Sequence, residues 1–395
     1  MQRNRLIYTL LLISVTFPAL SNADSVFTRI ADSTQWYSNF SLPSVNSSGV
    51  VAFRADSNPG GGTMTGIFTG TGGAVTTDYI TNLGFIRTDP AINESSQIAF
   101  DGFGTGAIGV SDHAIFRLTG GTLTQIYIDP VQIPTSTAIA NNGTVFFTAS
   151  GPLLGNHSTF GSGTGGPVTF YIGPNGPGIV RNVAVNSLGQ GAVEHSAGTL
   201  TTTIDYIKVD GTNVLSSDTA RYDGPMGLAP VVGFGDVAIN AAGKIVFPAN
   251  YDFTASDDLF TYANGQLYMI AHGHAQPAIN DSDVIAALFD QSGTSPKEIR
   301  AGDGAPTDKV IATGDPFMGS TVTDLGMSSL SLSKGGQLAF YAKLADGRNG
   351  IYVTVVPEPS TVSLLLLGVA LAGKRRRSYR SRAVVSAPPS SPCPA

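Results

Sequence analysis

Short apolar segments separated by Asn- and Gly-containing turns recur along the chain from residue 45 to residue 340. Each copy reads as an apolar residue, Asn, two small or polar residues, Gly, one further residue, and an apolar run that usually ends in Ala-Phe or Val-Phe. The Asn position falls at residues 46, 93, 140, 186, 240, 280 and 333, so the spacings are 47, 47, 46, 54, 40 and 53 residues. This pattern predicts seven copies of one structural unit.

Each copy predicts a tight β-hairpin. Asn at the first position and Gly at the fourth suit a type I turn closed by a left-handed residue. The Asn side chain bonds the backbone two residues on, and Gly adopts a positive φ without a Cβ clash. Ala140 and Ser333 replace Asn, while Ser96 and Asp283 replace Gly. We interpret the repeated residues as structural rather than as a ligand-binding ring of Asn side chains: Asn46, Gly49, Asn93, Gly143, Asn186, Gly189, Asn240, Gly243, Asn280 and Gly336.

A second pattern between these turns predicts further strands. Residues 66–70 and 74–80 form a strand, a Gly-containing turn and a strand, and residues 114–128 and 258–270 repeat the arrangement. One period therefore contains about four strands. Four strands in roughly 40 to 50 residues match a blade of a β-propeller. A β-helix needs a shorter rung, and separate sandwich domains need about twice the length.

The two ends of the repeat region predict a closed ring. After the seventh copy the chain makes one more strand, residues 350–356, without the partner strand of earlier periods. Residues 26–30 precede the first copy and can supply that partner. Their pairing removes an exposed edge and completes the seventh blade of an all-β, seven-bladed propeller. An open solenoid is the alternative.

Composition and charge agree with an exported all-β body. The 395 residues include 48 Gly but only 13% charged residues, and we find no helical periodicity between residues 24 and 356. Residues 24–373 hold 14 basic and 28 acidic residues, which disfavours nucleic acid or an anionic membrane as a partner of the body. The single Cys393 lies in the tail, so the body contains no disulfide and no thiolate metal site.

Residues 1–23 read as a secretion signal. Arg3 and Arg5 form its positive end, residues 6–19 are apolar, and residues 21–23 offer small side chains for cleavage. A transmembrane anchor is the alternative, but the apolar core is short for one. The expected domains are the signal (1–23), the propeller (24–356), a sorting segment (357–377) and a Pro- and Ser-rich tail (378–395).

The sorting segment resembles the PEP-CTERM signal of exported Gram-negative proteins. It consists of Pro357, Glu358 and Pro359, an apolar stretch at residues 362–373, and a basic cluster that includes Arg375, Arg376 and Arg377. The resemblance implies processing by an exosortase while the apolar stretch holds the precursor transiently in the inner membrane. Twelve helical residues span about 18 Å, short of a hydrocarbon core of about 30 Å. The tail at residues 378–395 departs from the usual pattern of the signal.

The body is similar to a tandem-repeat family of such exported proteins, whose signature is Asn-x-x-Gly-x-x-Ala-Phe. Asn46, Gly49, Ala52 and Phe53 match this signature fully, and the resemblance covers residues 40–345. It implies a surface repeat protein of unassigned activity.

Three short motifs could carry chemistry. Residues 161–166 have the Gly spacing of a dinucleotide loop, but no helix follows to supply backbone amides. Ser331 and Lys334 have the Ser-x-x-Lys spacing within a repeat hairpin. His272 and His274 could chelate a metal as a pair, although no third ligand is evident. We therefore interpret all three as structural loops or turns.

Two acidic pairs, Asp257 with Asp258 and Asp281 with Asp283, offer a weak calcium site. We otherwise expect no cofactor, no metal and no catalytic residue. Two function classes follow. The first is a non-catalytic surface or matrix protein that binds exopolysaccharide or an envelope protein. The second is a propeller hydrolase or lyase that acts on such polysaccharide, with its site at the central channel.

Overall fold

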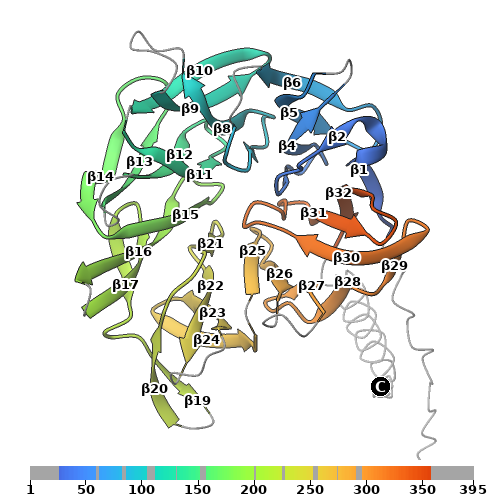
Figure 1. Ribbon diagram of the computed structural model, residues 1–395. Helices are drawn as coiled ribbons and strands as arrows, with labels where there is room; N and C mark the ends of the chain where they lie inside the picture. Colours follow the sequence, from blue (N-terminus) through green and yellow to red (C-terminus); the bar gives the residue numbers. More distant parts are fainter. Residues whose placement is uncertain are drawn as a thin grey trace, which may run out of the picture.

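Seven antiparallel sheets surround one axis, as Figure 1 shows. The structure is a computed structural model, and it describes residues 26–356 except residues 59–61, 82–85, 105–111, 130, 152–156, 200–201, 225–226, 252–256, 274 and 291–295. The arrangement is that of a β-propeller, so the prediction of an all-β fold with seven blades is confirmed.

The blades follow the repeats in chain order. The first four are blade 1 with β2 (Tyr37–Ser38), β3 (Ser44–Val45), β4 (Val51–Ser57), β5 (Met64–Gly70) and β6 (Thr76–Thr81); blade 2 with β7 (Ala91–Ile92), β8 (Ile98–Gly104), β9 (Asp112–Thr119) and β10 (Thr122–Asp129); blade 3 with β11 (Ile133–Ile139), β12 (Val145–Ser150), β13 (His157–Gly163) and β14 (Thr169–Pro177); and blade 4 with β15 (Ile179–Val185), β16 (Gly191–Thr199), β17 (Thr202–Val209) and β18 (Thr212–Ser216).

The remaining three are blade 5 with β19 (Arg221–Gly224), β20 (Gly227–Val232), β21 (Ala238–Ile239), β22 (Ile245–Tyr251), β23 (Asp257–Ala263) and β24 (Gln266–Ala271); blade 6 with β25 (Ala275–Ile279), β26 (Val284–Phe289), β27 (Glu298–Asp303) and β28 (Asp308–Ala312); and blade 7 with β29 (Pro316–Phe317), β30 (Ser320–Gly326), β31 (Gln337–Leu344), β32 (Asn349–Val355) and β1 (Thr28–Asp32). The short 3-10 helix η1 (Ser33–Gln35) follows β1. The strand pairs predicted from the second sequence pattern, β5–β6, β9–β10 and β23–β24, are confirmed.

The hydrophobic core is divided among the seven interfaces between neighbouring blades. Each of the seven clusters of buried apolar side chains draws residues from two adjacent blades. A strand between two such clusters is covered on both faces, so its sequence is continuously apolar rather than alternating. All six residues of β26 are buried for this reason. No blade buries its two faces alone, so the ring must be complete for every interface to be covered.

The N-terminal strand closes the ring. In Figure 1, β1 lies beside β32, and the two pair antiparallel from Thr28 opposite Val353 to Asp32 opposite Gly350. The predicted closure is therefore confirmed, although β1 begins two residues later than the expected segment 26–30. Gly350 is required at this contact, because a Cβ on it would lie 2.3 Å from the carbonyl oxygen of Ala31. The structure thus excludes the open solenoid.

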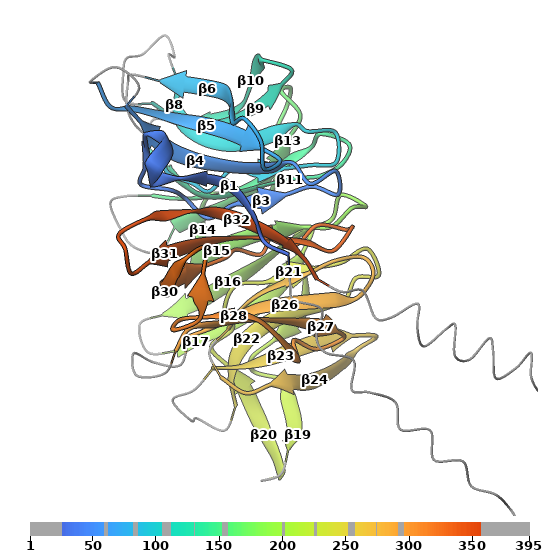
Figure 2. The same ribbon diagram turned by 90° about the vertical axis from the view of Figure 1, so that its right-hand side faces the viewer.

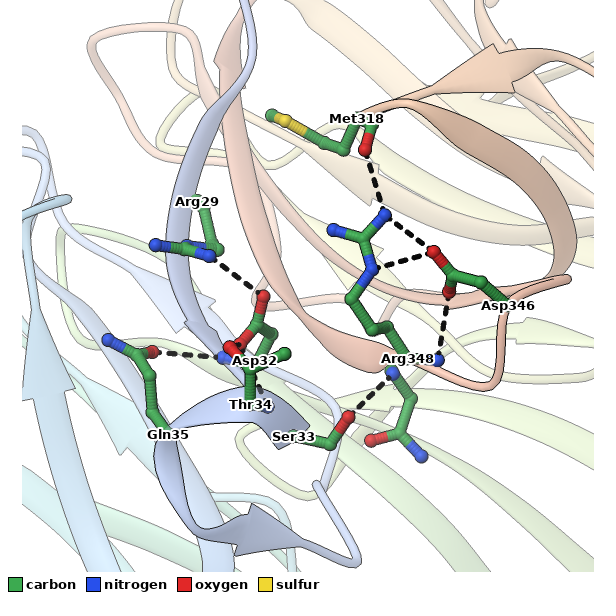
Figure 3. A network of polar contacts seen from close by, with 9 residues as sticks. Arg29, Asp32, Ser33, Thr34, Gln35, Met318, Asp346 and Arg348 are labelled. Carbon is green, nitrogen blue, oxygen red and sulfur yellow. Dashed lines mark hydrogen bonds and ion pairs between the residues drawn. The ribbon is translucent and has the colours of Figure 1, made fainter.

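Polar contacts hold the turn that follows β1 against blade 7 (Figure 3). Asp32 caps η1 by accepting a hydrogen bond from the Thr34 backbone N–H at 3.0 Å, and its other carboxylate oxygen pairs with Arg29 at 3.0 Å. The Ser33 hydroxyl accepts from the Asn349 N–H at 3.3 Å. In the same region Arg348 pairs with Asp346 and donates to the carbonyl of Met318. The Ser33–Asn349 bond therefore joins the turn after the closing strand to β32, in addition to the backbone pairing along β1.

Blade 5 departs from the four-strand unit. Its first two strands, β19 and β20, form an extra hairpin that projects from the ring in both Figure 1 and Figure 2. This hairpin accounts for the longest spacing, 54 residues, between the Asn positions 186 and 240. Within the part of the chain that the structure describes, no helix has the length and apolar character needed to cross a membrane. The expected signal (1–23), sorting segment (357–377) and tail (378–395) lie outside that part.

Candidate functional site

The seven Asn positions surround the propeller axis on one face, which we call the turn face. Five of them carry Asn, and each of these side chains is buried. In each, Oδ1 accepts backbone N–H bonds from the second and fourth residues that follow. In Asn46, these bonds come from Ser48 and Val50 at 3.1 and 3.0 Å. Gly49 closes the turn with φ +76°. The hairpins therefore have the hydrogen bonding that the sequence predicts.

The same Asn side chains also join neighbouring blades. Nδ2 donates to the backbone carbonyl at the equivalent position of the next blade in four copies: Asn46 to Asn93 at 3.2 Å, Asn93 to Ala140 at 2.9 Å, Asn186 to Asn240 at 3.0 Å, and Asn280 to Ser333 at 3.2 Å. In a fifth, Asn240 donates to the Asp283 carboxylate at 3.5 Å. One side chain thus stabilises its own turn and one interface, a role that the sequence pattern alone did not reveal.

Copies that lack Asn or Gly retain the turn by other contacts. In the third copy, Asn142 accepts the Thr144 N–H at 2.9 Å in place of the missing side chain at Ala140. In the seventh, the hydroxyl of Ser333 accepts from the Gln337 N–H at 3.0 Å. Ser96 and Asp283 stand where Gly is expected and adopt φ +56° and +67°. The backbone geometry is therefore kept where the residue type is not.

The residue after the Asn position adds further contacts between blades at three of the interfaces. Glu94 accepts hydrogen bonds from the backbone and the hydroxyl of Ser47, Asn141 accepts from the Glu94 N–H, and Asp281 accepts from the Ala241 N–H at 2.8 Å. The axial cavity between these turns has a volume of about 110 Å³. Its wall includes the apolar residue that precedes each Asn position: Val45, Ile92, Ile139, Val185, Ile239, Ile279 and Leu332. The turn face of the axis is therefore an interblade joint.

The opposite end of the axis is polar. A cavity of about 80 Å³ is lined by the residues four positions before each Asn position: Leu42, Asp89, Ser136, Asn182, Asp236, Gln276 and Ser329. Burial raises the pKa of Asp89 to about 6, against the opposing effect of the hydrogen bond from the Leu42 N–H. Both axial cavities are much smaller than the roughly 300 to 1,000 Å³ of a small-molecule site. Neither axial cavity therefore reaches the usual size of a small-molecule site.

A larger groove lies between blades 4 and 5. Its volume is about 390 Å³, and its walls are β18, the turn that leads to β19, and the β23–β24 hairpin. The lining residues combine half-buried apolar or aromatic groups with exposed polar groups: Asn213, Val214, Leu215, Ser216, Thr219, Ala220, Arg221, Tyr262, Gly265 and Leu267. This composition is typical of a small-molecule site. The groove lies where the spacing between copies is longest, which was the one available sequence signal.

The motifs considered for chemistry serve the fold. Residues 161–166 form the end of β13 and the start of the turn to β14. They are therefore followed by a strand and not by the helix that a dinucleotide loop requires. Ser331 is buried and donates to the Pro43 carbonyl at 3.0 Å, whereas Lys334 is exposed. His272 lies 3.3 Å from the Asp258 carboxylate, and His274 lies outside the described residues. The placements of residues 161–166 and of Ser331 agree with a structural role for these two motifs.

The acidic pairs are also engaged by neighbouring groups. Asp258 accepts from the Gly273 N–H at 3.1 Å, and Asp283 pairs with Lys244 at 2.9 Å. Asp281 belongs to the interblade contacts above. Within residues 26–356, as far as they are described, His, Cys, Asp and Glu do not gather in groups of three or more that could hold a metal ion.

A buried carboxyl pair in blade 4 was not predicted from the sequence. The Ser196 hydroxyl lies 2.6 Å from Glu194 and 2.6 Å from Asp205, and Arg181 pairs with Glu194 at 2.9 Å. Burial raises the pKa of Glu194 to about 7. The Ser196 hydroxyl has one hydrogen, so it donates fully to only one of the two carboxyl groups at a time. The Glu194 side chain has no exposed surface, so a polymer cannot reach it.

Two family models match parts of the chain. A PEP-CTERM protein-sorting motif matches residues 355–380, which include Pro357, Glu358, Pro359 and the basic residues Arg375 to Arg377, all outside the described residues. A family of unknown function, DUF7453, matches residues 232–363, about a third of the chain. Neither is the tandem-repeat family, so that resemblance stays a prediction. No curated protein matches the sequence.

Several solved structures are similar to the chain at low sequence identity. One, from a structural and mechanistic analysis of two prolyl endopeptidases, is 12% identical with a TM-score of 0.51, and the alignment covers 82% of this chain and 49% of that one. Prolyl oligopeptidase B from Galerina marginata is 12% identical, with a TM-score of 0.47 and coverage of 79% and 46%. PorZ, a surface component of the type-IX secretion system of Porphyromonas gingivalis, is 13% identical, with a TM-score of 0.43 and coverage of 78% and 45%.

The chain spans about half the length of each of these proteins. The sorting motif indicates where the protein is located. It is the signal that an exosortase recognises, and it implies transient anchoring in the membrane. The chain is thus an exported protein that combines a seven-bladed β-propeller with a PEP-CTERM sorting motif.

Proposed function

We propose that the protein is a non-catalytic component of the cell surface or extracellular matrix that binds exopolysaccharide through the groove between blades 4 and 5. The groove carries this proposal. It is several times larger than either axial cavity, and it combines an aromatic ring with amide and hydroxyl groups. A sugar presents an apolar C–H face together with hydroxyls, so it requires both kinds of contact. Export by the sorting motif brings the groove to the compartment that contains such polymers.

The rigidity of the ring supports a binding role. The walls of the groove belong to two blades whose interface is filled by a cluster of buried side chains, among them Phe234, Phe247 and Phe260. Asn186 on blade 4 also bonds the backbone of Asn240 on blade 5 at 3.0 Å. A groove held in one shape loses little conformational entropy when it binds a ligand.

The test is binding of the purified exported protein to immobilised polysaccharides, with Tyr262→Ala as the groove variant. We expect binding to weaken about tenfold or more, because the variant removes the one aromatic ring that lines the groove. Tyr268→Ala is the matched control, since Tyr268 is on the same hairpin but does not line the groove. Thermal melts of both variants verify folding.

Two results would count against the proposal. The first is no binding to any polysaccharide of the panel, and the second is equal binding by the Tyr262 variant and its control. The hydrolase or lyase alternative predicts new chain ends when the polysaccharides are incubated with the protein. Binding that leaves chain length unchanged supports the non-catalytic role.

A further inference from the structure

Two cationic side chains stand at the groove between blades 4 and 5. Arg221 forms part of the lining, and its Nη1 donates to the Ala220 carbonyl at 2.8 Å. A guanidinium has five N–H donors, so this bond leaves most of them for a ligand. At the other end, Lys208 donates from Nζ to the lining residue Asn213 at 2.5 Å and lies 5.5 Å from the centre of the Tyr206 ring. Both cations are thus held at the groove by neutral groups.

These cations contrast with the charge of the rest of the exported body, which holds 14 basic and 28 acidic residues. Within the described residues, at least seven of those 14 basic side chains form ion pairs with carboxylates: Arg29, Arg181, Lys244, Lys297, Arg300, Lys309 and Arg348. Among the described residues, neither Arg221 nor Lys208 has a carboxylate partner. An acidic surface repels a polyanion in general, whereas these two cations can attract an anionic group at the groove.

The spacing of the cations favours a ligand with more than one charge. Lys208 is opposite Asn213 in the β17–β18 pair, and Arg221 follows the far end of β18 at Ser216. Three residues of strand separate Asn213 from Ser216, or about 10 Å. The two cations therefore come from opposite ends of β18, an arrangement that suits an oligomer with repeated carboxylates.

Nearby carboxylates limit the attraction. Asp218 is exposed on the turn before β19 and accepts a hydrogen bond from the hydroxyl of the lining residue Ser216. Asp223 is exposed on β19, two residues beyond Arg221, and does not line the groove. The contacts to a ligand carboxylate therefore depend on the local donors of Arg221 and Lys208 rather than on the net charge of the region.

We propose that the ligand of this groove is an acidic polysaccharide, recognised by its repeated carboxylates through Arg221 and Lys208. The proposal rests on the function proposed above and specifies its ligand class. It predicts that the protein distinguishes two polymers that share a backbone and differ only in charge.

The test compares binding of the exported protein to polygalacturonate and to the same polymer after methyl esterification, which removes the charges but keeps the sugar rings. We expect the charged form to bind about tenfold or more tightly, and its affinity to fall as salt is raised. Arg221→Gln and, separately, Lys208→Gln should abolish most of this difference. Arg300→Gln is the control, since it changes the net charge by the same amount. Arg300 lies on blade 6, away from the groove, and pairs with Glu298. Asp218→Asn should strengthen binding of the charged polymer.

Equal affinity for the two polymers would overturn the proposed ligand class, and so would an undiminished preference in both the Arg221 and Lys208 variants. Either result leaves the polysaccharide-binding function standing if Tyr262→Ala still weakens binding. No binding to any polysaccharide would remove the function itself and the ligand class with it. Thermal melts of the variants show whether a loss of binding reflects a loss of fold.

Discussion

Replacing Asn93 by Ala tests whether the repeated Asn residues stabilise the ring. Its Oδ1 accepts the N–H groups of Ser95 and Gln97 at 3.0 and 2.9 Å, and its Nδ2 donates to the Ala140 carbonyl of blade 3 at 2.9 Å and to the Gln97 side chain at 2.9 Å. Each such bond contributes about 1 kcal/mol net, and water can replace those near the surface. We therefore expect a loss of about 3 kcal/mol.

The assay is thermal unfolding followed by circular dichroism or calorimetry. Unfolding entropy is about 2 cal/mol/K per residue, so over the 331 residues from 26 to 356 a loss of about 3 kcal/mol lowers the melting temperature by about 4 °C. Ser95→Ala is the control, since Ser95 is exposed on the same turn and its hydroxyl makes no hydrogen bond within the described structure.

The third copy offers the reverse experiment. Ala140 occupies the Asn position of this copy and lacks the amide side chain. The substitution Ala140→Asn should therefore supply the missing hydrogen bond to the backbone carbonyl of Asn186 on blade 4. We expect a gain of about 1 kcal/mol. The reasoning would be refuted if the Asn93→Ala variant had the same melting temperature as the Ser95→Ala control. The buried hydrogen bonds between blades would then contribute nothing measurable to stability.

Three further predictions concern closure, pH and processing. Deleting residues 26–32 should lower the melting temperature markedly, because β32 loses its backbone partners and the buried Ile30 and Ala31; an unchanged melt would contradict closure. Because burial raises the pKa of Glu194 from 4.5 to about 7, the folded state retains a proton that the unfolded chain releases, so stability should fall by up to about 3 kcal/mol as pH rises from 4.5 to 7. Glu194→Gln should flatten that part of the melting-temperature profile, and a slope equal to that of the unmodified protein would contradict the assignment. Replacing Glu358 and Pro359 should leave uncleaved precursor in the membrane fraction, whereas mass spectrometry that recovers an intact tail to Ala395 from the unmodified exported protein would contradict processing.

The groove shows why only part of the candidate site could be predicted. Tyr262 and Arg221 are 41 residues apart and belong to no common motif, and they line one groove because β19 and β23 lie in the same blade, opposite β18 of blade 4. The longer spacing between the fourth and fifth copies indicated an insertion but not a cavity. The central channel, which the fold class suggested as the site, is instead narrowed by apolar side chains at the turn face.

The roles of the residues around the axis could also be predicted only in part. Asn and Gly at fixed positions determine a turn through contacts within five residues, so the sequence was sufficient for the hairpins, their number and the seven-bladed ring. The Nδ2 bond of Asn46 reaches a carbonyl 47 residues away, and only the closed ring brings the two atoms to 3.2 Å. Asp89 and Asp236 occupy equivalent positions in the repeat, four residues before the Asn position. The repeat alignment did not show that these residues line one cavity.

The sequence by itself determined the repeat, the fold class, the closing strand and the sorting motif, because each depends on local backbone preference or on a short contiguous signal. The tertiary structure alone decided the register of β1, the contacts between blades, the buried trio around Ser196 and the groove at Arg221. These features depend on how two blades meet, and that geometry is set by the packing of side chains far apart in the chain.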